Sequence, residues 1–104
     1  MGDKKYELRY LPLFEQDLIQ TVNYIVNVLK NPDAADKLVN DVETAILERL
    51  NNPLGFEPYP SVKKRKHPYY RIYIRNYVVY YVVIGNIMEV RRFLYGARDT
   101  EKYL

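Results

Sequence analysis

The chain has 104 residues, of which 16 are lysine or arginine, 13 are aspartate or glutamate and none is cysteine. This length suits one domain spanning residues 1–104. Without cysteine and with His67 alone, disulfides, thiolate metal sites and multi-histidine sites are excluded, and we expect no metal and no other cofactor. No apolar run reaches the about 18 residues of a membrane span, and the start lacks a signal peptide, so we expect a cytoplasmic protein with no membrane partner.

The charge of the chain is polarised along its length. Residues 62–104 carry ten basic and three acidic side chains, a formal charge of +7. Residues 1–61 carry six basic and ten acidic side chains, or −4. A basic half of this density indicates a polyanionic partner.

The first half of the chain predicts a short strand and two helices. Residues 6–11 alternate apolar and charged side chains and stop at Pro12, as a short strand does. Over residues 13–30 apolar side chains recur every three or four positions, which predicts a helix. Asn31 is a suitable N-cap for a second helix over residues 32–50. The short connection makes the two helices an antiparallel hairpin.

The second half predicts a loop followed by three strands. Residues 54–68 hold three of the six prolines and Gly55, together with a basic run, so they form an extended loop. Gly85-Asn86 is a two-residue hairpin turn. Alternation and apolar runs place the strands at residues 69–75, 77–84 and 87–95.

The resulting order is β-α-α-β-β-β, an α+β fold in which an antiparallel sheet carries the helical hairpin on one face. We expect the hairpin to pack through Phe14, Leu18, Val22, Ile25, Leu38, Val42 and Ile46 onto Ile72, Ile74, Val78, Val82 and Leu94. The opposite face then carries tyrosine and arginine side chains, which is typical of a surface that binds RNA. Glu89 and Arg91 share that face, and we expect Glu89 to form a cross-strand ion pair there.

Three features in this order and spacing resemble the RelE/ParE toxin superfamily. The first is the helical hairpin with Asn-Pro-Asp-Ala-Ala at residues 31–35. The second is the strand Tyr-Arg-Ile-Tyr-Ile-Arg-Asn-Tyr at 70–77, which runs into Val-Val-Tyr-Tyr at 78–81. The third is the ending Phe-Leu-Tyr-Gly-Ala-Arg-Asp at 93–99.

The resemblance implies the toxin of a type II toxin–antitoxin system, of the plasmid stabilisation type, silenced by a cognate antitoxin protein. Members similar to RelE are endoribonucleases that cut mRNA in the ribosome, so it implies a metal-independent mRNA interferase with the ribosome and mRNA as partners. A homodimer or a toxin–antitoxin hetero-oligomer is the expected assembly. An acidic antitoxin segment is expected to cover the groove of Arg71, Arg75 and Arg91.

The resemblance also implies roles for particular residues. Arg75 and Arg98 match arginines that hold the scissile phosphate in these relatives. Tyr103 lies one residue from the position at which the relatives carry a tyrosine that stacks on an mRNA base. One or more of Lys63, Lys64 and Lys66 match loop lysines of the family. The predicted catalytic residues are therefore Arg75, Arg98, Lys63, Lys66 and Tyr103, and the predicted substrate-binding residues are Lys64, Arg71, Tyr73, Arg91 and Tyr95.

Two alternatives remain open at this point. Members similar to ParE inhibit DNA gyrase without catalysis, and the long helical hairpin favours that reading. Tyr95 stands where many relatives have a histidine, so that an inactive member of the family is the third reading.

Overall fold

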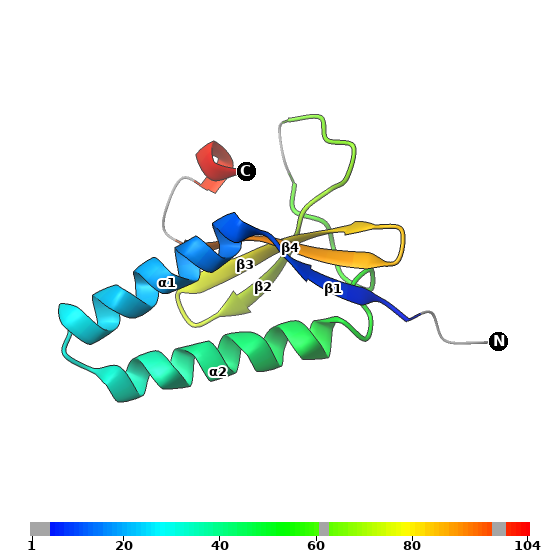
Figure 1. The fold of residues 1–104 in the computed structure, drawn as a ribbon. Helices are drawn as coiled ribbons and strands as arrows, with labels where there is room; N and C mark the ends of the chain where they lie inside the picture. The colour runs from blue at the N-terminus through cyan, green and yellow to red at the C-terminus, as the bar shows by residue number, and fades with distance from the viewer. Residues whose placement is uncertain (1–4, 61–62, 97–99) are drawn as a thin grey trace.

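A computed structural model describes residues 5–60, 63–96 and 100–104. Within these ranges the chain forms four strands, two α-helices and a short 3₁₀ helix, η1 (Figure 1). In chain order these are β1 (Glu7–Tyr10), α1 (Pro12–Asn27), α2 (Pro32–Arg49), β2 (Tyr70–Ile74), β3 (Tyr77–Ile84), β4 (Ile87–Tyr95) and η1 (Thr100–Tyr103). The α+β class is confirmed.

The sheet is mixed rather than antiparallel, which corrects the prediction from the sequence. Its strand order is β1-β4-β3-β2; β2, β3 and β4 pair antiparallel, whereas β1 pairs parallel with β4. The cause is the direction of the helices: α1 continues the path of β1 and α2 reverses it, so that β2 starts at the same end of the sheet as β1 (Figure 1). Two hairpin reversals then leave β4 running in the direction of β1.

Local sequence rules account for the helical hairpin. Pro12 and Pro32 stand at the first turns of α1 and α2, where a missing N–H costs no hydrogen bond. Asn31 caps α2 as predicted, because its Oδ1 accepts a hydrogen bond from the backbone N–H of Ala34 at 3.1 Å. The helix α1 ends three residues before its predicted end, and Lys30, with a φ of 54°, turns the chain into α2.

The two helices cover one face of the sheet and bury an apolar core there, which we call the helix-facing core. From α1 come Phe14 and Ile25, and from α2 come Leu38, Val42 and Ile46, all buried. Every one of these residues was predicted for the core from the helical period. The strands contribute Tyr70, Ile72, Ile74, Val79, Tyr81, Met88, Val90 and Phe93.

Three residues predicted for this core are on the opposite face: Val78, Val82 and Leu94. The turn between β2 and β3 contains two residues, Arg75 and Asn76, so that Ile74 pairs with Tyr77. The odd-numbered residues of β3 therefore share a face with the even-numbered residues of β2. The prediction from the sequence ended this strand at residue 75, one residue later than β2 ends. It therefore assigned Val78 and Val82 to the wrong face of the sheet.

A β-bulge explains the position of Leu94. The register between β3 and β4 shifts between Tyr80 and Tyr81, and this leaves Arg91 as an extra residue in β4. Beyond the bulge the alternation is displaced by one residue, so Phe93 packs under the helices and Leu94 faces away.

The face opposite the helices is partly covered by chain segments from outside the sheet. Tyr69, Val78, Tyr80, Val82 and Leu94 are buried there. The side chains that pack against them include Tyr59 from the loop after α2 and Leu104 from the C-terminal segment. This outer face therefore contains both apolar and polar contacts, and it carries the candidate site.

Candidate nucleic-acid interface

A groove of about 360 Å³ lies on the outer face, at the end of the sheet where β2 turns into β3. We call it the tyrosine–arginine groove. It brings together four of the residues proposed from the sequence, namely Arg71, Tyr73, Arg75 and Tyr95. The full lining is Tyr59, Arg71, Tyr73, Arg75, Asn76, Tyr77, Val78, Tyr80, Tyr95, Gly96 and Thr100.

Arg71 is held in the groove by two aromatic rings. Its guanidinium carbon lies 5.0 Å from the ring centroid of Tyr59 and 5.6 Å from that of Tyr73. Cation–π contacts of this kind orient the guanidinium and leave its N–H groups able to donate elsewhere. Tyr73 is 65% exposed, so its ring also presents a face to solvent.

Arg75 occupies the tip of the β2–β3 hairpin in an unusual backbone conformation. Its φ of 54° lies in the left-handed region. In the β3–β4 turn the corresponding conformation, with a φ of 62°, is adopted by a glycine, Gly85. Its guanidinium forms an ion pair with Asp41 of α2, and both side chains remain more than two-fifths exposed. This pair is weak because it is solvated, so an incoming anion can compete with Asp41 for Arg75.

The tyrosines of the groove differ in what they can do chemically. Tyr95 is 44% exposed and its ring packs edge-on against Tyr77, with centroids 5.9 Å apart, so it offers a stacking surface. Tyr80 is buried. Burial raises the pKa of the Tyr80 phenol, and a hydrogen bond with Thr100 offsets this only in part. Tyr80 therefore stays protonated at neutral pH and serves as a hydrogen-bond donor.

Arg91 lies outside the groove lining and is engaged by Glu89. Glu89 is 5% exposed and accepts hydrogen bonds from Arg91 Nε at 2.8 Å and, across the strands, from Arg9 Nη1 at 2.9 Å. Burial alone would raise the pKa of Glu89, but the hydrogen bonds from the two arginines outweigh it and hold that pKa below its usual range. The predicted cross-strand ion pair of Glu89 is confirmed.

Arg92 ties the helices to the outer face. Its Nε and Nη2 atoms donate to the carboxylate of Asp17 on α1 at 2.8 and 3.0 Å, and its Nη1 donates to the carbonyl oxygen of Tyr103 at 2.9 Å. Asp17 also accepts the backbone N–H of Phe93 at 3.0 Å, beyond the point where β1 stops pairing with β4. The Asp17 carboxylate thus accepts a backbone N–H from the free edge of β4. It also positions the guanidinium of Arg92, which in turn binds the C-terminal segment.

Of the remaining proposed residues, those that the structure describes are not part of the groove lining. Lys63 donates through Nζ to the carbonyl oxygen of Glu101 at 3.4 Å. Lys64 and Lys66 are exposed in the loop, and Tyr103 lies beside Arg92. Arg98 lies outside the described residues. The structure therefore groups the substrate-binding candidates better than the catalytic ones.

Several lining residues were not proposed from the sequence: Tyr59, Asn76, Tyr77, Val78, Tyr80, Gly96 and Thr100. Tyr59 had a readable signal, since it is an aromatic residue between Pro58 and Pro60 in a loop expected to carry function. Tyr80 had none, because it lies in an apolar run that reads as buried on both faces.

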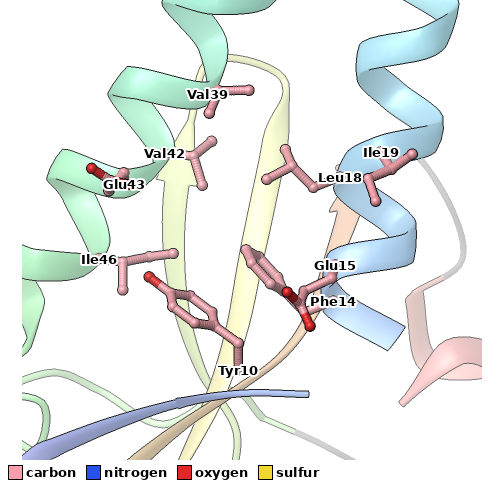
Figure 2. A pocket seen from close by; sticks show the side chains of 9 residues that line it. All are labelled: Tyr10, Phe14, Glu15, Leu18, Ile19, Val39, Val42, Glu43 and Ile46. Atoms are coloured by element: carbon pink, nitrogen blue, oxygen red, sulfur yellow. The ribbon is translucent and has the colours of Figure 1, made fainter. Parts of the chain in front are cut away.

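A second cavity, of about 250 Å³, opens between α1 and α2 and differs in character. Figure 2 shows Tyr10 rising from β1 between the two helices, with apolar side chains on either side. Glu15 and Glu43 are the charged residues of its lining. Burial, followed by these two carboxylates, raises the pKa of Tyr10. An apolar cavity with acidic walls is unsuited to a polyanion.

Within residues 5–60, 63–96 and 100–104, no three His, Cys, Asp or Glu side chains lie close enough together to bind a metal ion. Within the same ranges, no helix combines the length and the apolar character that crossing a bilayer requires.

Comparison with known proteins gives a family and a fold. Residues 8–100 match the family model described as the ParE toxin of the type II toxin–antitoxin system parDE. Among proteins with curated descriptions, none matches this chain.

Two solved structures share the fold. One, from the chromosomal ParDE toxin–antitoxin system of P. aeruginosa, has a TM-score of 0.70 and 17% sequence identity, covering 88% of this chain and 96% of that one. The other, from the E. coli DinJ–YafQ toxin–antitoxin complex, has a TM-score of 0.55 and 11% identity, covering 89% and 94%. At these identities the likeness concerns the fold alone.

Proposed function

This chain belongs to the ParE toxin family of type II toxin–antitoxin systems, and we propose that it is an endoribonuclease toxin that cuts mRNA on the ribosome. The observation that carries this proposal is the tyrosine–arginine groove, where Arg71 and Arg75 lie among exposed tyrosine rings. Arginine matches the charge and geometry of phosphate, and tyrosine rings stack on unpaired bases. Single-stranded RNA presents both groups side by side.

Metal-free cleavage of RNA needs three contributions: a base that takes the proton of the 2′-OH, cations that stabilise the charge developing on phosphorus, and an acid for the departing 5′ oxygen. Arg71 and Arg75 supply the cations. Among the described lining residues there is no lysine, histidine or carboxylate, so the base comes from the adjoining loop, where Lys63 and Lys66 lie. A tyrosine phenol, at Tyr95 or Tyr103, supplies the acid.

The proposed partner in the cell is a cognate antitoxin, because both structural relatives come from toxin–antitoxin systems. An antitoxin segment rich in Asp and Glu would complement the +7 charge of residues 62–104. By covering the groove, such a segment would exclude RNA. Its affinity is then expected to fall as salt concentration rises.

A second candidate function is inhibition of DNA gyrase without catalysis. Two observations favour it: the matching family model is that of ParE, and the described groove residues include no general base. In that case the same arginines would contact the target protein, and no RNA would be cut.

One experiment separates the two functions. Purified wild-type protein is added to a translating extract, where mRNA ends are mapped, and in parallel to purified gyrase, where supercoiling is measured. We expect new mRNA ends that require ribosomes, together with unchanged supercoiling. The variant Lys37→Ala, which removes an exposed cation from α2, is expected to behave as wild type. Inhibition of supercoiling with intact mRNA would contradict the endoribonuclease proposal and support the gyrase inhibitor.

A further inference from the structure

The C-terminal segment places a carboxylate against the basic loop that precedes β2. Glu101 accepts hydrogen bonds from Tyr59 Oη at 3.0 Å and from Arg65 Nη2 at 3.4 Å. The backbone oxygen of Glu101 accepts a further one from Lys63. The side chains of Arg65 and Glu101 are only 17% and 24% exposed, so these contacts are largely shielded from solvent.

The donors around Glu101 also have contacts that do not involve the Glu101 side chain. The guanidinium carbon of Arg65 lies 4.9 Å from the ring centroid of Tyr69, just before β2, and its Nη1 donates to the carbonyl oxygen of Leu104 at 3.1 Å. The backbone N–H of Tyr59 donates to Tyr69 at 2.6 Å. Tyr59 and Arg65 would therefore keep their orientation if Glu101 were displaced.

Tyr59 connects these donors to the tyrosine–arginine groove. Its hydroxyl donates to Glu101, while its ring stacks against Arg71 and lines the groove. A ligand that followed the groove past Arg71 would thus arrive at Arg65. Carboxylate and phosphate both present paired anionic oxygens, and both accept hydrogen bonds from guanidinium and phenol groups.

We propose that Tyr59 and Arg65 form a second phosphate subsite for single-stranded RNA, which the carboxylate of Glu101 occupies in the free protein; this rests on the proposed RNA-binding function of the groove. The C-terminal segment then limits RNA binding until a phosphate displaces Glu101. RNA fits this arrangement better than an acidic peptide does. The ring of Tyr59 lines the groove, where a base can stack, and its hydroxyl lies at the subsite, where the neighbouring phosphate can bind.

The test removes the charge of Glu101 and measures RNA binding by the full chain. The variant is Glu101→Gln, and the matched control is Glu48→Gln, which removes the same charge from the exposed surface of α2. The probe is a single-stranded 2′-O-methyl RNA of about 12 nucleotides, long enough to span groove and subsite. It cannot be cut, because its 2′ oxygens carry no proton. Affinity is measured by fluorescence anisotropy between 50 and 200 mM salt.

We expect Glu101→Gln to bind the RNA about threefold to tenfold more tightly than the control at the low-salt end, with a slope of log affinity against log salt steeper by about 0.7, as one additional phosphate contact requires. Adding Arg65→Ala to Glu101→Gln should abolish both changes. Thermal melting of each variant checks that the chain is folded.

Three results would overturn the subsite. Equal affinity and slope for Glu101→Gln and Glu48→Gln, with wild type binding RNA, would overturn it and leave the groove intact as an RNA site. Absence of RNA binding by every variant would overturn both the subsite and the proposed function. A gain for a polyglutamate peptide without a gain for RNA would assign the donors to an acidic protein segment instead.

Discussion

The two faces of the sheet are stabilised by different kinds of contact. Under the helices, aliphatic and aromatic side chains such as Val42, Ile46 and Met88 are almost completely buried. On the outer face, buried side chains are mixed with arginines that lie over tyrosine rings or pair with carboxylates. The helices α1 and α2 together carry seven acidic and two basic side chains, so the two sides also differ in charge.

This difference separates folding from binding. The helix-facing core supplies apolar burial, which is the main favourable term in folding. In the tyrosine–arginine groove, by contrast, Tyr73 and Tyr95 are exposed, and the ion pair of Arg75 with Asp41 is solvated and weak. Substitutions in the helix-facing core should therefore affect stability, and substitutions in the groove should affect activity.

The largest expected effect concerns activity and lies on the outer face. Arg71→Ala and Arg75→Ala should each lower the rate of mRNA cleavage by roughly 100-fold to 1,000-fold, because a preorganised cation at the scissile phosphate is lost. Their melting temperatures should stay close to that of wild type, since neither side chain is buried. Cleavage rates in a translating extract and thermal melts provide the measurement. A variant that melts as wild type and still cleaves at the full rate would remove that arginine from the site.

The next effect concerns stability and lies under the helices. Ile46→Ala should lower the free energy of unfolding by about 2 to 4 kcal/mol, because Ile46 is 1% exposed and its removal leaves a cavity. Leu47→Ala is the matched control, since Leu47 is the next residue of α2 and is 49% exposed. It should change stability by no more than about 0.5 kcal/mol. Similar losses in denaturant titrations of both variants would contradict the core assignment.

A smaller effect depends on pH and tests the polar contacts of the outer face. The pKa of Glu89 is held below its usual range in the folded protein, so its ion pairs stabilise the fold above the unfolded pKa of about 4.3 and lose that contribution as pH falls through the folded value. Glu89→Gln should therefore be less stable than wild type at pH 7, and the gap should narrow below about pH 4. Chemical denaturation across pH gives the comparison. A gap that is constant with pH would mean that Glu89 contributes no charge-dependent stability.

The smallest effect should have opposite signs for stability and activity. Arg75→Gly relieves a left-handed backbone at φ 54° and should raise the free energy of unfolding by up to about 1 kcal/mol, although glycine also gains unfolded-state entropy. The same variant should lose toxicity. Gly85→Ala, at the corresponding position of the other turn, should instead destabilise the protein. Loss of stability in Arg75→Gly would show that the contact with Asp41 outweighs the strain.

Much of the fold follows from local rules in the sequence. The cap at Asn31, the buried stripe of α2 and the hairpin at Gly85 depend on neighbouring residues, and each was predicted where it lies. The parallel pairing of β1 and the bulge at Arg91 depend on contacts between distant segments, and because of the bulge, periodicity alone misassigned the face of Leu94. The faces of Val78 and Val82 were misassigned because the β2–β3 turn contains two residues.

The candidate site divides in the same way. Arg71, Tyr73 and Arg75 come together because alternate residues of one strand share a face, and that alternation is visible in the sequence. Tyr59 and Thr100 reach the groove from a loop and from the C-terminal segment. No local sequence pattern predicts that the loop after α2 and the C-terminal segment pack against the outer face.

The most direct test of the central claim is to map where RNA touches the protein. Single-stranded RNA is crosslinked to the chain by ultraviolet light, and the attached peptides are identified by mass spectrometry. We expect crosslinks at Tyr73 and Tyr95, which are 65% and 44% exposed in the groove. Tyr10, 38% exposed in the acidic cavity between the helices, is the internal control and should remain unmodified. Crosslinks at Tyr10 with none at Tyr73 or Tyr95 would contradict the assignment of RNA binding to the outer face.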